Sequence, residues 1–278
     1  MKEGFIVQHK DRIIRPENYK DLGSDLLVTS IFRTLQGEAP FSGWPAVFLR
    51  LAGCNFGNKD TMSACQFCDT YFNFDSGERY SPNALLEKLL ATAKPGDMLV
   101  VTGGEPTLQH NLLDFLEIAN QYFDVIQIET NGTQASFFQK LSYFEETNVI
   151  PISRRPGYSG VYTVVSPKGI YKAGVTPKPS NHTWRRAGCL NVVREAGEGP
   201  HNLVPEWAFE WRDKTGLPIY VSPMAIYNRP YAGEISSIWE EGLFDIEATS
   251  KNYSYAAKYA IDNSLRLSIQ SHILTAIP

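Results

Sequence analysis

Short apolar segments alternate with helical patterns along most of this chain of 278 residues. Eight segments have the apolar or β-branched character of strands, and they span residues 26–34, 46–51, 98–101, 125–128, 162–165, 190–193, 219–223 and 265–269. Helical patterns cover residues 81–93, 108–122, 137–144, 204–215 and 253–262. Repeated β–α units predict an α/β fold with a parallel sheet, which binds its ligands at the carboxyl ends of the strands.

Three of the four cysteines lie within residues 51–70. Cys65 and Cys68 form a CxxC pair, and ten residues separate Cys54 from Cys65. Three thiolates without a fourth nearby suit a four-iron cluster with one open iron, because soft sulfur ligands favour iron–sulfur chemistry. A structural zinc usually has four protein ligands, and Cys189 is distant. Spacing alone leaves a cluster, a zinc site and three unrelated thiols as alternatives.

Composition argues against several classes of protein. The net charge is −4 and a fifth of the residues are charged, which disfavours a dedicated nucleic-acid binder. Clustered cysteines do not resemble a disulfide framework, and they favour a reducing cytoplasm. The sequence shows neither a cleavable leader nor an apolar run of membrane-spanning length. We therefore predict a cytoplasmic protein without a membrane partner, with an N-terminal extension over 1–25 and a single domain over 26–278.

Five polar motifs accompany the cysteine stretch: QGE at 36–38, GGEP at 103–106, ETNGT at 129–133, SPK at 166–168 and QSH at 270–272. Together they resemble the radical S-adenosylmethionine (SAM) superfamily and, within it, the 7-carboxy-7-deazaguanine synthases. The resemblance covers residues 30–223 with gaps and resumes over the final dozen residues. The superfamily's usual cysteine spacing is Cys-x3-Cys-x2-Cys, but some members of this synthase family share the longer loop. Ala39 stands where the family generally has glycine.

The resemblance implies an incomplete parallel β/α barrel and a radical SAM lyase. Such an enzyme converts 6-carboxy-5,6,7,8-tetrahydropterin to 7-carboxy-7-deazaguanine with loss of ammonia, on the way to queuosine-type nucleosides. A 4Fe–4S cluster on Cys54, Cys65 and Cys68 would cleave SAM to a 5′-deoxyadenosyl radical, and SAM would be regenerated as a cofactor. No catalytic side chain is expected beyond the cluster and SAM.

The same resemblance assigns the binding residues. For SAM they are Phe67, Gly103, Gly104, Glu105, Thr130, Ser166 and Lys168, with Glu105 read as an exposed carboxylate for the SAM ammonium. For the pterin they are Gln36, Glu38, Arg50, Gln270, His272 and Pro278, the last through its free carboxylate. Thr70 would touch a magnesium ion that also binds substrate, although a threonine there is ordinarily a cap or turn residue.

The sequence leaves two interpretations open for Arg50 and for residues 168–187. Arg50 ends a core strand and is either paired structurally or directed at the substrate carboxylate, which we favour. Residues 168–187 form either a lid or a solvated loop, and residues 226–243 suggest an oligomer interface. We also expect a flavodoxin or ferredoxin as electron donor and a homodimer.

Two rival functions remain from the sequence. One is a radical SAM activase that makes a glycyl radical on a partner protein, against which the QGE and QSH motifs argue. The other is a non-catalytic zinc- or cluster-binding module, in which the GGEP turn would have no purpose.

Overall fold

The computed structural model describes residues 21–56, 77–169, 174–226, 228, 242, 244–271 and 274. Over these residues the strands form one sheet in the order β3-β1-β2-β4-β5-β6-β7-β8-β9. Every pairing from β2 to β9 is parallel, whereas β1 pairs antiparallel with both β2 and β3. The predicted α/β class and the largely parallel open sheet of a partial barrel are therefore confirmed.

The strands are short, as expected for units joined by helices. They are β1 (Leu26–Leu35), β2 (Pro45–Leu51), β3 (Glu78–Tyr80), β4 (Met98–Gly103), β5 (Val125–Thr130), β6 (Gly160–Val165), β7 (Cys189–Arg194), β8 (Ile219–Pro223) and β9 (Arg266–Leu267). The α-helices are α2 (Pro82–Thr92), α3 (Leu112–Ala119), α4 (Ala135–Glu146), α5 (Asn181–Arg186), α6 (Glu206–Thr215) and α7 (Ile246–Asp262), and η2 (Ala39–Phe41) and η4 (Pro106–Leu108) are short 3-10 helices.

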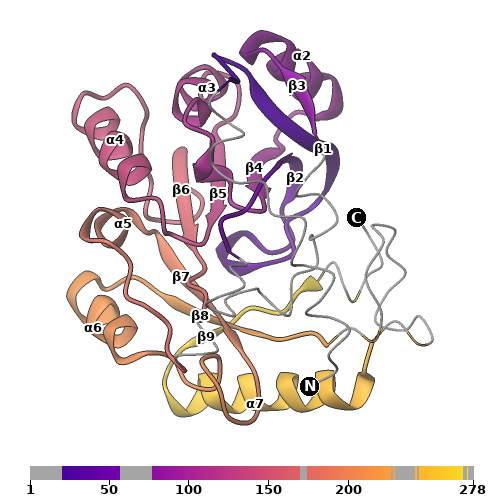
Figure 1. Ribbon diagram of the computed structural model, residues 1–278, viewed down its shortest axis with the longest axis vertical. Helices are drawn as coiled ribbons and strands as arrows, with labels where there is room; N and C mark the ends of the chain where they lie inside the picture. The colour runs from indigo at the N-terminus through magenta and orange to yellow at the C-terminus, as the bar shows by residue number, and fades with distance from the viewer. Residues whose placement is uncertain are drawn as a thin grey trace.

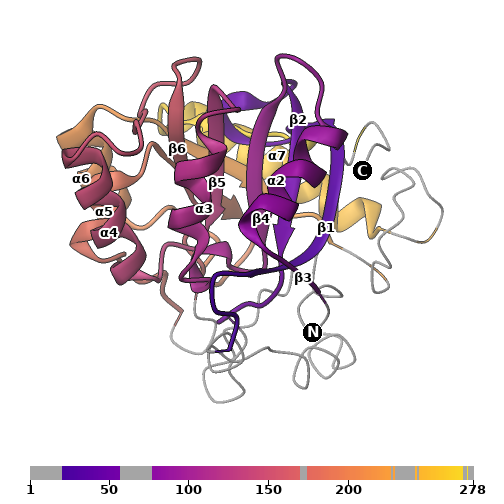
Figure 2. The same cartoon turned by 90° about the horizontal axis from the view of Figure 1, so that it is seen from above.

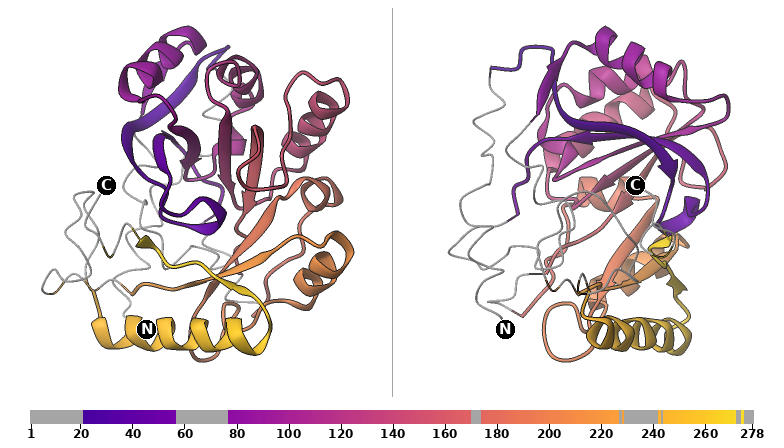
Figure 3. Two further views of the ribbon diagram at one scale, coloured as in Figure 1. Left: turned by 180° about the vertical axis from the view of Figure 1, so that it is seen from behind. Right: turned by 90° about the vertical axis from the view of Figure 1, so that its right-hand side faces the viewer.

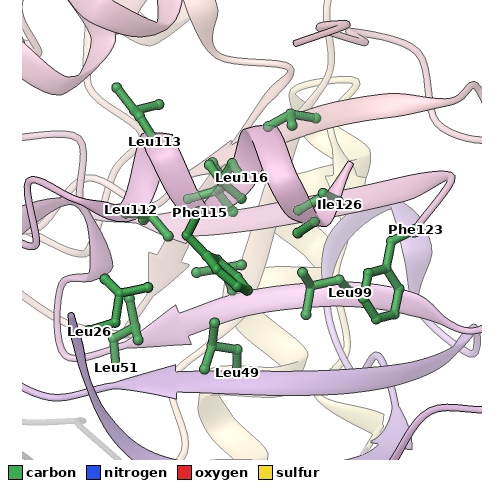
Figure 4. Packing of buried hydrophobic residues seen from close by; sticks show 14 of the residues in the cluster. Leu26, Leu49, Leu51, Leu99, Leu112, Leu113, Phe115, Leu116, Phe123 and Ile126 are labelled. Carbon is green, nitrogen blue, oxygen red and sulfur yellow. The ribbon is translucent and has the colours of Figure 1, made fainter. Parts of the chain in front are cut away.

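The helices form an arc around the outside of the curved sheet (Figures 1 and 2). One core lies between helices α2, α3 and α4 and strands β1 to β6, and a second lies between α6, α7 and strands β7 and β8. Figure 4 shows the first core, where Phe115 and Leu116 of α3 face Leu49 of β2 and Leu99 of β4. All four side chains are fully buried, and burying each contributes about 1.5–3 kcal/mol.

A third cluster fills the concave inner face of the sheet. It includes Phe48, Val100, Tyr162 and Cys189, whose thiol is fully buried. The interior is therefore packed with apolar side chains along much of the strands, and the polar motifs that follow the strands gather at their carboxyl ends.

The two ends of the open sheet meet through a turn and a segment that follows β9, not through strand pairing. Ala39 N–H donates to Ser268 Oγ at 2.7 Å, and Ser271 N–H donates to the Gly37 carbonyl at 3.1 Å. Figure 3 shows this side of the molecule from behind. The turn after β1 thereby closes the barrel against the chain that follows its last strand.

Two predicted helices begin at residues well away from their expected starts, for local reasons. The helix expected from 108 begins at Leu112, because the Gln109 side chain donates to the Leu27 and Ala52 carbonyls and its backbone turns to an extended conformation. The helix expected from 253 begins at Ile246, because Asp245 caps it through Ala248 N–H.

Two further segments differ as well. Residues 168–187, expected to be irregular, contain α5, whose first turn is capped by Ser180 through Thr183 N–H. The strand expected over 265–269 shortens to β9. Within the described ranges, no helix is both long and apolar enough to cross a membrane.

Candidate active site

The motifs after β2, β4, β5 and β6 lie at one edge of the sheet because those four strands run parallel. The turn after β4 has the closest packing. A Cβ on Gly103 would lie 2.2 Å from the Leu51 carbonyl oxygen. A Cβ on Gly104 would lie 2.3 Å from the Gly53 carbonyl oxygen and 2.6 Å from Cys54 Cβ. Only glycine lets this turn sit directly against the start of the cysteine loop.

Glu105 ends that turn, and its carboxylate is fully buried, so the expectation of an exposed carboxylate was wrong. Oε1 accepts hydrogen bonds from Thr107 N–H at 3.1 Å, from the Thr107 hydroxyl and from the Thr130 hydroxyl at 2.7 Å. Oε2 accepts from Asn131 N–H at 2.6 Å. Burial raises the pKa of Glu105, and these hydrogen bonds oppose the shift. The side chain therefore holds the ends of β4 and β5 together.

Side-chain amides fasten the start of the cysteine loop to the segment after β5. Asn55 donates to Thr133 Oγ1 at 2.8 Å and accepts from Asn131 Nδ2 at 2.9 Å. Cys54 itself is buried next to Gly104. One predicted cluster ligand is thus held in place against the predicted SAM turn. The predicted ligands Cys65 and Cys68, with Phe67 and Thr70, lie outside the described residues.

The SPK segment after β6 continues the same edge. Ser166 N–H donates to the Thr130 carbonyl at 2.7 Å, and Lys168 Nζ donates to Ser166 Oγ at 2.9 Å. Both side chains are partly exposed. The structure therefore brings Thr130, Ser166 and Lys168 into one row beside Glu105.

A second acidic group lies around the turn between β1 and β2. Glu38 accepts from Gln270 Nε2 at 2.6 Å and from Asn191 Nδ2 at 3.0 Å. Glu129, on β5, accepts from Gln36 Nε2 at 2.8 Å and from Gln127 Nε2 at 2.9 Å. Three predicted substrate residues, from two distant parts of the chain, therefore join one network.

The two carboxylates of this network lie close enough to affect each other. Burial raises the pKa of Glu129, the nearby charge of Glu38 raises it further, and Arg50 lowers it. The Arg50 guanidinium lies 5.6 Å from the centroid of the Phe32 ring. Two acids and one arginine at a strand edge suit a small heterocycle that carries both N–H donors and a carboxylate.

Sequence reasoning missed several members of this network. They are Glu129, Asn191 of β7, Ser222 of β8 and Ser268 after β9. Ser222 Oγ lies within hydrogen-bond distance of two acceptors, Asn191 Oδ1 and the Ser268 carbonyl, both at 3.1 Å. Glu129 could have been identified, because it opens a motif that follows a buried strand. Asn191 and Ser222 sit inside apolar strands, and the sequence gives no signal that separates them from ordinary strand residues.

Gln270, predicted to bind the substrate, donates to Glu38, another predicted substrate residue, whereas His272 and Pro278 lie outside the described residues. Ala39, where the resemblance suggests glycine, has a left-handed backbone with φ +55°. A left-handed alanine costs roughly 1–2 kcal/mol, which explains why glycine would suit this turn.

Comparisons with known proteins agree with this geometry. A family model described as the radical SAM superfamily matches residues 50–153. A 7-carboxy-7-deazaguanine synthase of Hyperthermus butylicus is 34% identical over 271 residues, covering 92% of this chain and 95% of the relative. One of Rickettsia prowazekii is 28% identical over 256 residues, covering 90% and 88%. The crystal structure of QueE from Escherichia coli, 20% identical, has the same fold with a TM-score of 0.56, covering 92% of this chain and 98% of that one.

Proposed function

The chain belongs to the 7-carboxy-7-deazaguanine synthase family of radical SAM enzymes. We propose that the group of residues around Cys54 and Glu105 binds the cofactors, and that a second group, around Glu38 and Glu129, binds the substrate. The family uses a 4Fe–4S cluster and SAM, and its substrate is a pterin. The observation that supports the proposal most directly is the contact of Cys54 with the Gly104–Glu105 turn, at the same sheet edge as Glu38 and Glu129.

The first group would bind the cofactors. Three thiolates, from Cys54, Cys65 and Cys68, fit a cluster with one open iron, and the buried Cys54 is the ligand that the described residues fix in place. When bound, the cluster and SAM supply the one-electron chemistry that starts the rearrangement. Glu105 has no exposed surface in the structure, so it would serve SAM binding by holding the ends of β4 and β5 in place around the ligand.

The remaining SAM residues surround that carboxylate. Gly103 and Gly104 bring the turn directly against the cluster loop, and Thr130, Ser166 and Lys168 offer hydroxyl and ammonium groups along the neighbouring strand ends. Phe67 would pack against the adenine.

The second group would bind the pterin. Glu38 and Glu129 can accept the ring N–H groups, Gln36 and Gln270 hold these acids in place, and Arg50 can pair with the substrate carboxylate. His272 and the terminal carboxylate of Pro278 would complete the site, and Thr70 would bind a magnesium ion shared with the substrate. We further propose a single domain over 26–278, a homodimer, a flavodoxin or ferredoxin as electron donor, and a cytoplasmic location.

Cluster absorption and product formation test this proposal in one experiment. Cys54→Ala and Cys189→Ala proteins are reconstituted anaerobically with iron and sulfide and then supplied with reductant, SAM, magnesium and 6-carboxy-5,6,7,8-tetrahydropterin. We expect Cys54→Ala to lose the visible cluster absorption and all 7-carboxy-7-deazaguanine formation. Cys189→Ala should keep both, because that thiol packs among apolar side chains on the inner face of the sheet. Equal loss in both variants would contradict the ligand assignment.

A further inference from the structure

Helix α7 is fastened over the carboxyl ends of the last strands by its N-terminal half. Asn252 Nδ2 donates to the Met224 carbonyl just after β8 at 2.9 Å, and Asn252 Oδ1 accepts from Ala196 N–H just after β7 at 2.8 Å. Thr249 Oγ1 accepts from Ile226 N–H at 3.0 Å. The first two turns of α7 therefore lie next to the edge that carries the active site.

Tyr253 lies on the face of α7 that points at this edge. The buried residues of the helix are Thr249, Asn252, Ala256 and Ala260, a stripe at helical spacing. Tyr253 comes four residues after Thr249 and three before Ala256, so it lies on the same face. Its side chain is half-buried, and its hydroxyl points inward with its oxygen enclosed.

That hydroxyl has no hydrogen-bond partner among the described residues. The two other tyrosines in the following turns are engaged. Tyr255 donates to the Asn202 carbonyl, and Tyr259 accepts from Val204 N–H at 3.1 Å. A buried hydroxyl without a partner costs about 1–3 kcal/mol, so such groups usually have a ligand to satisfy them.

The charge state of Tyr253 and the nearby Glu38 indicate which kind of ligand group the hydroxyl can bind. Burial raises the pKa of Tyr253 to about 12, and the charge of Glu38 contributes to the rise. The phenol therefore remains neutral and able to donate at any working pH. The Glu38 carboxylate, which Gln270 and Asn191 hold, therefore lies close enough for its charge to act on this hydroxyl.

We propose that Tyr253 is a further substrate-binding residue, which donates its hydroxyl hydrogen bond to the ring carbonyl of the pterin. This inference rests on the proposed function. In the pterin ring that carbonyl lies next to a ring N–H, and the exocyclic amino group lies on the other side of the same N–H. Glu38 supplies an acceptor for such N–H donors, and the carbonyl beside them then needs a donor. A neutral phenol can supply that donor, and a ligand without the ring oxygen would offer the phenol hydrogen no acceptor.

Binding measurements on Tyr253→Phe test this role, with Tyr255→Phe as the matched control. The ligands are 7-carboxy-7-deazaguanine, which keeps the same carbonyl and N–H edge, and its analogue with a hydrogen in place of the ring oxygen. Loss of one neutral hydrogen bond should raise the Kd of the product, and the KM of the pterin, roughly three- to tenfold. The value of kcat, SAM affinity and cluster absorption should stay near those of wild type. The analogue without the ring oxygen should bind wild type and Tyr253→Phe equally.

Unchanged product affinity in Tyr253→Phe would overturn the inference, as would an equal loss in Tyr255→Phe. An equal loss of affinity for the analogue without the ring oxygen would also overturn it, because the effect would then not depend on the carbonyl. The proposed function fails separately: in that case wild-type protein itself neither forms nor binds 7-carboxy-7-deazaguanine.

Discussion

The two acidic turns at the active-site edge differ in the burial and the hydrogen-bond partners of their carboxylates. At the turn after β4, Glu105 is fully buried, its oxygens accept four hydrogen bonds from backbone and hydroxyl groups, and two glycines leave no room for a side chain. At the turn after β1, Glu38 accepts flexible amide donors and lies near a second acid, Glu129. The first turn is a fixed part of the scaffold, and the second is a group of like charges that a ligand with N–H donors would stabilise.

Truncating the first carboxylate should have the largest effect on stability. Glu105→Ala leaves the N–H and O–H of Thr107, the hydroxyl of Thr130 and Asn131 N–H without an acceptor in a buried site. Each unsatisfied buried donor costs about 1–3 kcal/mol, and relaxation offsets part of the sum. We expect the free energy of unfolding to fall by at least about 3 kcal/mol in urea titrations.

Glu129→Ala is the matched control for that measurement. Glu129 is less buried than Glu105, and its truncation leaves space in which a water molecule can accept from the buried amides of Gln36 and Gln127. Its truncation should cost less than about 1 kcal/mol. Similar losses in the two variants would remove the distinction between a scaffold acid and a ligand acid.

Glu129→Gln should separate function from stability at the second turn. The amide oxygen can still accept from Gln36 and Gln127, so the fold should persist, but an acceptor for substrate N–H groups loses its charge. A hydrogen bond to a charged group contributes about 1.5–3 kcal/mol, so kcat/KM for the pterin should fall roughly ten- to a hundredfold.

The pH dependence of unfolding gives a second measurement on the same variant. Glu129 has a raised pKa in the folded state, so its ionisation costs stability at pH values above that pKa. The cost disappears as the pH falls below the ordinary glutamate value of about 4.3. Glu129→Gln should therefore be at least as stable as wild type at pH 7, and this advantage should vanish below about pH 4. A variant less stable than wild type at pH 7 would show that the charge of Glu129 supports the fold.

The sequence predicted these two regions unequally well, and the reason is physical. Glycines and an acid directly after a buried strand suited a ligand turn at 103–105, although ordinary loop geometry uses glycine in the same way, and the resemblance to radical SAM enzymes decided between the two. Whether Glu105 was exposed could not be predicted, because its four donors come partly from residues 130–131, which reach it only through the pairing of β4 with β5.

Long-range contacts explain the other omissions. The contacts Glu38–Asn191 and Glu38–Gln270 join residues 153 and 232 positions apart, and no local pattern encodes such a distance. The parallel strands were predictable from alternating β–α units, but the antiparallel β1, which lies between β2 and the edge strand β3, was not, because its apolar pattern resembles that of a parallel strand.

The smallest expected effect comes from exchanging the residue types that distinguish the two turns. Ala39→Gly relieves a left-handed alanine at φ +55°, worth roughly 1–2 kcal/mol, but it also frees the unfolded chain and removes a buried methyl group, which together cost about as much. The free energy of unfolding should change by less than about 1 kcal/mol.

The reverse exchange at the first turn, Gly104→Ala, places a Cβ 2.3 Å from a carbonyl oxygen and must displace the Cys54 loop, so it should lower both stability and cluster content. Denaturant titrations of the two variants, with iron content measured for each, make the comparison. If Gly104→Ala kept wild-type stability and iron, the close packing of the first turn would not be what holds Cys54 in place.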